Sequence, residues 1–406
     1  MGGKGSKHDH IDPLTQDEND AIDRLMSYKE ITTFDDLIHK WTSYLTPNMN
    51  GHLKQMIATT KPCRQRVVHV YRCLTICELY HASYLKLMTM VLSKSNVQLY
   101  TTDLLETIIL CLKDTNEYAY WIQIGAKSHT THQLASQLSK KGLSGDINAW
   151  LQGNTLLALL HKALITTLYF VPHKLNLLPS IDINQKYKQS FKTILDVGWI
   201  MFIKNSLPVE CQENWRLLFS SSSHGESFQS LSSAIIDQGD TILILRDHIG
   251  NVFGGYASQP WLLKPKFYGD SSSFLFSLHP NLNICNASGH NDHYMYMNNG
   301  QYTLPNGIGM GGQLDYWGLW LDAEYGIGLS NVSCSTYSDY SMLSAVKDFK
   351  IDALEVWCVK EKPINDDVEE ERIQTKSNRD DWDVKLLEMA GRTKYSDGLK
   401  EEHDET

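Results

Sequence analysis

The sequence lacks most of the patterns by which enzymes and metal proteins are recognised. Its eight cysteines are scattered along 406 residues without a CxxC pair, which excludes zinc ribbons and thioredoxin-like redox motifs. The nucleophile elbow GxSxG is also absent, which excludes the hydrolases that present a serine on that turn. We therefore expect reduced, buried thiols in a cytosolic protein, with no resident metal or cofactor.

Long apolar runs are missing as well. The best candidate, Leu156 to Val171, has His161 and Lys162 near its middle, and it is shorter than the ~20 apolar residues that a membrane-spanning helix needs. The run therefore predicts a buried core helix.

Positive charge is scarce. The formal net charge is −10, which argues against a nucleic-acid partner, because such proteins carry a basic patch or stripe. From Glu361 to Thr406 there are 15 acidic and 8 basic residues, so the end of the chain holds most of the excess.

Glycine, asparagine and aromatic residues are concentrated between Ile284 and Asp322. The apolar, aromatic runs Tyr294–Met297 and Trp317–Leu321 are typical of half-buried strands. Between them, Pro305–Gly307 and Gly311–Gly312 favour tight turns, because these residues tolerate positive φ. The stretch predicts a compact β core.

Further short strands surround this stretch. A helix containing Phe228, Leu231 and Ile235, ended by Gly239, interrupts them. Many short strands with few helices predict two packed antiparallel sheets, a β-sandwich, around an aromatic core. The remaining predicted strands are Trp215–Phe219, the hairpin Thr241–Asp247 and Val252–Ala257, Phe274–Leu278, and Leu354–Val359.

Several separated motifs resemble the TLDc domain family. They are Ser223–Phe228, Asn251–Tyr256, Gln259–Trp261, Phe267–Asp270 and Leu354–Trp357, together with the glycine-rich stretch. The resemblance covers roughly 178–361, and the run from 289 to 313 is most similar to the lysosomal, mTOR-associated branch of the family. The motif residues that it singles out are His224, Gly225, Glu226, Gly254, Gly255, Trp261, Gly269, Gly311, Gly312, Trp317, Gly318, Trp320 and Trp357.

The resemblance implies a function as well as a fold. Proteins of this family have no established reaction or cofactor, and they associate with the V-type proton ATPase. The most similar branch is tied to lysosomal membranes and to mTOR signalling. An adaptor with V-type ATPase and mTOR-pathway partners is therefore expected, on the cytoplasmic face of the lysosomal membrane and in the cytoplasm.

The first residues fit an N-myristoylation pattern, with Gly2 after the initiating methionine and Ser6 four residues later. The alternative interpretation is a flexible polar terminus. One myristoyl chain binds a membrane only marginally, with K of roughly 10⁴ M⁻¹. Residues 1–14 are therefore predicted to be a lipidated leader that requires a second anchor.

Residues 15–177 are predicted to form a mostly helical half. Thr15 and Glu18 make a capping box, and Ile31–Leu37 begins a second helix. This helix–loop–helix rhythm is similar to a degenerate EF-hand, but no twelve-residue loop with alternate oxygen ligands is present, so no calcium site is expected. Helices continue from 67 to 112, Gly142–Gly153 is predicted to be a connection, and Tyr187–Asn205 another helix.

Four clusters could carry chemistry. Ser223–Ser227 contains a histidine, an acid and hydroxyls, and the alternative function is a hydrolase or an oxidative-stress-protective enzyme that uses this region or a TLDc cleft. Capping of the next helix explains the same residues. Gly307–Gly312 lacks the lysine and the following helix of a phosphate loop. Polar turns or a solvated surface explain His290–His293, and the pair His129 and His132, better than a metal does.

The end of the chain divides into an acidic linker, 362–379, and a segment 380–406. Trp382, Leu386 and Met389 share one face of a predicted helix, which also contains Leu387 and stops at Gly391. A tethered amphipathic helix can fill a groove in a partner, so we expect a second contact with the ATPase. The alternative is docking onto the chain's own domain.

Overall fold

The computed structural model describes most of the chain up to residue 362. The chain divides into two units, Met1–Glu361 and Lys362–Thr406, and the described residues other than Lys362 belong to the first. Gly2, the expected helix at Ile31–Leu37, and the expected tail helix with Trp382, Leu386, Leu387 and Met389 lie outside them. The described residues are 14–27, 39–57, 64–75, 81–92, 96–143, 147–171 and 175–362.

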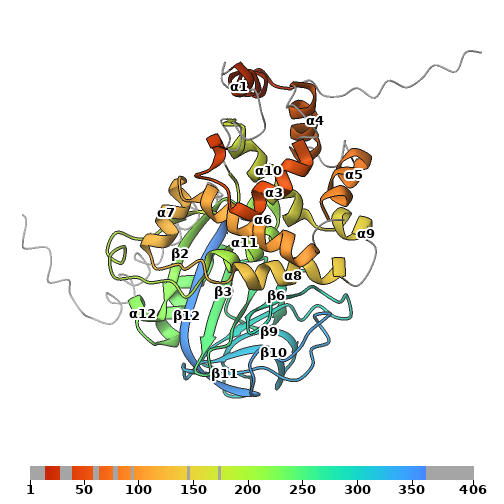
Figure 1. Ribbon diagram of the computed structural model, residues 1–406. Helices are drawn as coiled ribbons and strands as arrows, with labels where there is room; N and C mark the ends of the chain where they lie inside the picture. Colours follow the sequence, from red (N-terminus) through yellow and green to blue (C-terminus); the bar gives the residue numbers. More distant parts are fainter. Residues whose placement is uncertain are drawn as a thin grey trace, which may run out of the picture. The chain divides into compact units, whose positions relative to one another are not determined.

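The first half is helical, as predicted (Figure 1). The capping box is confirmed, because the Glu18 carboxylate accepts the Thr15 amide at 2.8 Å and the Thr15 hydroxyl accepts the Glu18 amide at 3.2 Å. The expected core helix at 156–171 is confirmed as α10. The helices are α1 Gln16–Ser27, α3 Pro47–Ile57, α4 Arg64–Thr75, α5 His81–Leu92, α6 Val97–Leu112, α7 Asn116–Gln123, α8 Thr131–Leu143, α9 Ile147–Gln152 and α10 Thr155–Leu168.

Two predictions about helices were wrong. The expected connection Gly142–Gly153 contains α9, whose Trp150 and Leu151 are buried. The expected helix Tyr187–Asn205 begins only at Val197, as α11 (Val197–Ser206). The preceding residues form turns because their polar groups bond to other parts of the chain, as when the Ile194 amide donates to Glu355.

The second half contains twelve strands within the described residues. Short helices α12 (Ser221–His224) and α13 (Phe228–Ile235) and a 3₁₀ turn at Val209–Cys211 accompany them. The predicted strands and the β3–β4 hairpin are confirmed. The strands are β1 Ser180–Asp182, β2 Asn214–Ser220, β3 Gly239–Asp247, β4 Val252–Ala257, β5 Lys264–Tyr268, β6 Phe274–His279, β7 Asn283–Cys285, β8 Met295–Asn298, β9 Gly307–Gln313, β10 Tyr316–Asp322, β11 Ile327–Leu329 and β12 Asp348–Glu361.

The predicted turn at Gly311–Gly312 was wrong, because both glycines lie inside β9. They nonetheless have φ of +73° and +91°, values that few other residues adopt. The turn between β9 and β10 instead contains Asp315, with φ of +63°.

All twelve strands form one curled sheet. Its main path runs β5-β8-β9-β10-β11-β12-β3-β4-β6-β7, with β2 on β12 and β1 on β2. The β1–β2 pair is parallel and the other pairs are antiparallel. The long strand β12 pairs first with β11 and then with β3 and β2, so it belongs to both layers of the fold. The antiparallel sandwich is confirmed, with its layers joined through this strand.

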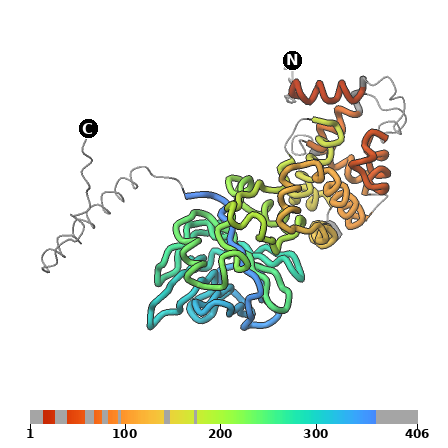
Figure 2. The backbone as a smooth tube through the Cα atoms, turned by 90° about the vertical axis from the view of Figure 1, so that its left-hand side faces the viewer, coloured from red at the N-terminus to blue at the C-terminus, as the bar shows by residue number. Residues whose placement is uncertain are grey.

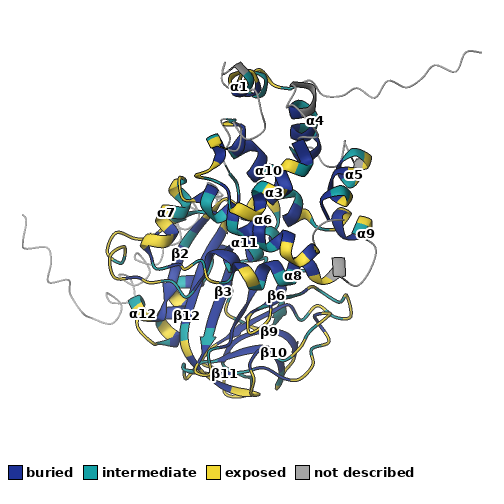
Figure 3. Ribbon diagram, viewed as in Figure 1, coloured by how far each residue is buried: buried dark blue, intermediate teal, exposed yellow. Residues whose placement is uncertain are grey.

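The layer around β3 is buried on both faces (Figure 3). Leu243 and Leu245 pack into the core between the two layers, with residues such as Met310 and Leu319 of the facing strands. The alternate residues Ile242 and Ile244 belong to a core that continues through the helices. This explains why the strand is an unbroken apolar run instead of an alternating one.

The helices and one face of the sheet therefore share a hydrophobic core, which is separate from the core between the two layers. The tube view follows the chain from the helices, coloured red to yellow, into the strands, coloured green to blue (Figure 2). Gln133 of α8 donates to the carbonyl of Leu278, inside β6, at 2.8 Å and to that of Pro280, just after β6, at 2.9 Å. Within the described ranges, no helix combines the length and apolar character needed to span a bilayer.

Candidate functional site

His224, the candidate base, lies at the end of α12 and serves the local structure. Its Nδ1 accepts the Ser220 amide at 3.1 Å. The ring packs between Tyr187 and Phe219, with centroid distances of 4.3 and 5.6 Å. Desolvation by these neighbours lowers the pKa of His224, which favours the neutral ring. One ring nitrogen is therefore committed to the backbone.

The neighbouring groups do not complete a catalytic arrangement. Glu226 is exposed, and the hydrogen bonds of the described residues include none between it and His224. The Ser227 hydroxyl accepts the Ser230 amide at 3.4 Å and so caps α13, as the structural alternative predicted. The Ser223 hydroxyl is buried and makes no hydrogen bond within the described part of the chain. Nothing positions a nucleophile against a base here.

The described cysteines are free thiols in unreactive surroundings. Burial raises the pKa of Cys211 and Cys285 to about 12 and that of Cys358 to about 11. A thiolate is the nucleophilic form, so these environments suppress thiol chemistry. Cys63 and Cys77 lie outside the described residues.

The histidine clusters serve polar turns and surface contacts. His293 bonds through Nδ1 to the Gly312 carbonyl at 2.6 Å, while Asn291 accepts the His293 amide. His132 lies 3.7 Å from Glu106, and the backbone amide of His129 donates to Asp196. Across the described ranges, no group of three or more histidine, cysteine or acidic residues is arranged to hold a metal.

The glycines of the motifs are close-packing positions. A Cβ on Gly254 would lie 1.9 Å from the Leu243 carbonyl oxygen, and one on Gly255 would lie 2.4 Å from the Met310 sulfur of the facing layer. A Cβ on Gly318 would lie 2.9 Å from the Cys334 sulfur. Only glycine allows neighbouring strands, facing layers and loops to approach so closely at these positions.

The remaining motif glycines have positive φ, and all but one are also close-packed. Gly269 has φ of +101°, and a Cβ there would lie 3.0 Å from Tyr294. Gly225, at the junction of α12 and α13, has φ of +86° but open space around it, so only its backbone conformation favours glycine. A Cβ on Gly311 would lie 2.7 Å from the Tyr337 ring, and one on Gly312 would lie 2.1 Å from the Tyr316 carbonyl oxygen. Gly307–Gly312 itself lies in strand β9, so it is not a phosphate-binding loop before a helix.

The motif tryptophans are structural anchors. Trp261 is fully buried and donates from Nε1 to the Thr241 hydroxyl at 2.8 Å. Trp317 stacks on Trp320 at 4.5 Å in a small cluster with Tyr296. Trp357 of β12 packs against Trp121 of α7, with 5.4 Å between the ring centroids. This contact connects the sheet to the helical half.

Two buried carboxylates, Glu355 and Asp196, hold residues 193–198 in place through hydrogen bonds. They were not singled out in the sequence analysis. Glu355 of β12 accepts the Ile194 amide at 2.6 Å and the Thr193 hydroxyl at 2.9 Å. Asp196 caps α11 through Gly198 and also accepts the His129 amide at 2.9 Å and the Thr130 hydroxyl. The available signals were an acid inside an apolar strand and an aspartate directly before a helix.

Comparison with known proteins agrees with this scaffold. Residues 188–360 match the sequence model of the TLDc domain. The chain is 49% identical over 226 residues to the MTOR-associated protein MEAK7 of Xenopus laevis, covering 53% of this chain and 47% of the relative. For the human protein of that name the identity is 42% over 236 residues, covering 56% of this chain and 50% of the relative.

A more distant relative is the nuclear receptor coactivator 7 of Mus musculus. It is 34% identical over 172 residues, which is 42% of this chain and 17% of the relative. The chain spans about half the length of the MEAK7 relatives that it matches. Residues 188–360 of this chain therefore form a TLDc domain, and the family resemblance seen in the motifs is confirmed.

Proposed function

We propose that this protein is a non-enzymatic adaptor in mTOR signalling that works on the cytoplasmic face of the lysosomal membrane. The observation that carries the proposal is its 42–49% identity over about half the chain to relatives named MTOR-associated proteins. The commitments of His224 and Ser227 to local structure support an adaptor over an enzyme, because both are engaged in hydrogen bonds that define α12 and α13.

The adaptor binds the V-type proton ATPase through its TLDc domain and its C-terminal segment, 380–406. Its rigid sheet suits recognition, since the motif glycines and tryptophans fix the backbone where side chains could not fit. A myristoyl group on Gly2 adds a weak anchor of roughly 10⁴ M⁻¹. Linking weak contacts raises the effective local concentration for the protein contacts.

Affinity purification from lysosomal membranes tests both contacts. The intact chain is expected to copurify with ATPase subunits and mTOR-pathway proteins. Gly2→Ala should move the protein out of the membrane fraction, whereas Gly3→Ala is the matched control and should not. Deleting 380–406 should weaken ATPase recovery while leaving the TLDc domain folded, as monitored by circular dichroism.

Three results would contradict the proposal. One is unchanged membrane recovery of Gly2→Ala, which removes the anchor. Another is undiminished ATPase recovery after the deletion, which removes the second contact. The third is recovery of neither ATPase subunits nor mTOR-pathway proteins with the intact chain, which removes the adaptor function itself.

A further inference from the structure

Strand β1 has one unpaired edge. It pairs with β2 in parallel, and Ser180 donates its amide to the Glu213 carbonyl at 2.8 Å. In a parallel ladder alternate residues bond to a given neighbour, so the peptide groups of Ile181 face away from β2. No other described strand pairs with β1. An open edge is a template for an added strand.

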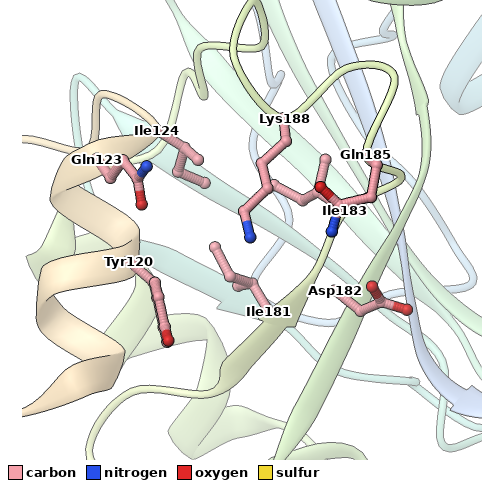
Figure 4. Close-up of a pocket in the computed structure, with 8 residues that line it drawn as sticks. All are labelled: Tyr120, Gln123, Ile124, Ile181, Asp182, Ile183, Gln185 and Lys188. Carbon is pink, nitrogen blue, oxygen red and sulfur yellow. The ribbon is translucent and has the colours of Figure 1, made fainter.

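A cavity of about 220 Å³ opens beside this edge, between β1 and α7. Gln123 lines it from the helix and Ile181 from the strand, and the amino group of Lys188 points into the gap (Figure 4). The volume exceeds the ~150 Å³ of a cavity that holds benzene but is below the ~300 Å³ of the smallest ordinary ligand pockets. It therefore suits one large side chain and not a complete cofactor.

The segment that follows β1 is basic in an otherwise acidic chain. Residues 184–192 include Lys186, Lys188 and Lys192 and no acid, against a net charge of −10 for the whole sequence. Lys186 and Lys188 are exposed. Lys192 donates to the Gln123 carbonyl at 3.0 Å, which holds the segment beside α7. Asp182 is the one acid among the cavity-lining residues, and it is drawn pointing away from the Lys188 amine (Figure 4).

We propose that the groove between α7 and β1 binds an extended acidic segment of a partner protein, which adds a strand to the free edge at Ile181 and places one side chain in the cavity. Strand addition supplies affinity through main-chain hydrogen bonds, while pockets for alternate side chains supply specificity. Lys186 and Lys188 attract the acidic segment. The site adds a contact to the proposed adaptor and stands whether or not the ATPase is a partner.

A model peptide tests the proposal on the full chain. The probe is a fluorescein-labelled eight-residue peptide of alternating glutamate and valine, which is extended, acidic on one face and apolar on the other. Fluorescence anisotropy at low ionic strength should show saturable binding, weakened at least tenfold by Lys188→Glu. The matched control is Lys266→Glu, the same charge reversal at an exposed position of β5, and it should bind as the unmodified chain does.

The backbone requirement is tested separately from the charge. The same peptide N-methylated at alternate residues keeps its charge but loses the amides that pair with Ile181, and it should not bind. A lysine–valine peptide should not bind either. The proposal is overturned by absent saturable binding to the unmodified chain, by equal effects of Lys188→Glu and Lys266→Glu, or by undiminished binding of the N-methylated peptide, which would leave a purely electrostatic contact. Circular dichroism confirms that the variants fold.

Discussion

Helix α3 of the helical half leaves space around its glycine, Gly51, whereas strand β4 of the sheet half leaves none around Gly254. A Cβ on Gly51 of α3 would meet no atom within 4 Å, whereas one on Gly254 of β4 would lie 1.9 Å from a backbone oxygen. Helices keep their separation through side chains that can repack. A strand between two covered faces has fixed backbone neighbours, so an added methyl group cannot be accommodated without breaking the ladder.

Each half also contains a fully buried ionisable group whose pKa is shifted. In the helical half, fully buried His161 forms hydrogen bonds with the hydroxyls of Tyr84 and Tyr100 at 3.1 and 2.7 Å, and burial lowers its pKa to about 3. In the sheet half, burial raises the pKa of Glu355 to about 7. Desolvation favours the neutral form of each, so these two groups make the stability depend on pH in opposite directions.

The largest effect is expected from the glycines. Gly254→Ala should destabilise the protein by more than about 5 kcal/mol or prevent folding, because its Cβ collides with the Leu243 carbonyl. Gly51→Ala should stabilise it by about 0.5–1 kcal/mol, since alanine favours a helix interior. Urea unfolding followed by circular dichroism measures both. Similar stabilities for the two variants would remove the contrast between the halves.

A smaller effect is expected at His161. The pKa of His161 in the folded protein lies below the unfolded value of 6.5. Its contribution to the free energy of unfolding is therefore present above pH 6.5 and is lost as pH falls towards 3. Between pH 7 and 4.5 this costs about 3 kcal/mol. His161→Phe should lower stability at pH 7 by about 1–3 kcal/mol through the lost hydrogen bonds. In urea unfolding at a series of pH values, its free energy of unfolding should nonetheless fall less steeply between pH 7 and 4.5 than that of the unmodified chain. His132→Gln, at an exposed position, should keep the original slope.

The smallest effect is expected at Glu355, with the opposite sign. Its folded pKa of about 7 lies above the unfolded value of 4.5, so its contribution is full below pH 4.5 and is lost as pH rises through 7. From pH 5.5 to 7.5 the loss is about 2 kcal/mol. Glu355→Gln cannot ionise and should remove this decline in unfolding titrations. Glu361→Gln, on the exposed end of the same strand, should retain it; identical profiles would refute the assignment.

Much of the fold follows from local sequence patterns. The capping box at Thr15 and Glu18, the unbroken apolar run of β3 and the cap at Ser227 depend on residues a few positions apart, and each appears in the structure. The wrong predictions concern segments whose conformation depends on distant partners. Ile194 lies outside a helix because its amide bonds to Glu355, 161 residues later.

The candidate site shows the same division. The motifs located the TLDc domain. The expected cap in the SHGES stretch is present at Ser227, because a serine before an amphipathic helix has a local role. Asp196 and the groove beside β1 were missed. No pattern within one segment reveals that α7 and β1, about 60 residues apart, enclose a cavity.

The sequence by itself determined most of the helices and the central strands, where several helices begin, and which family the residues from 188 to 360 join. These properties rest on side-chain periodicity, caps and glycines with special φ values, all of which act over a few residues. Only the tertiary structure decided that β12 joins both layers, that His224 is occupied by a backbone amide, and that β1 keeps an open basic edge. Those outcomes depend on which segments, far apart in the sequence, pack against one another and bury their surfaces from water.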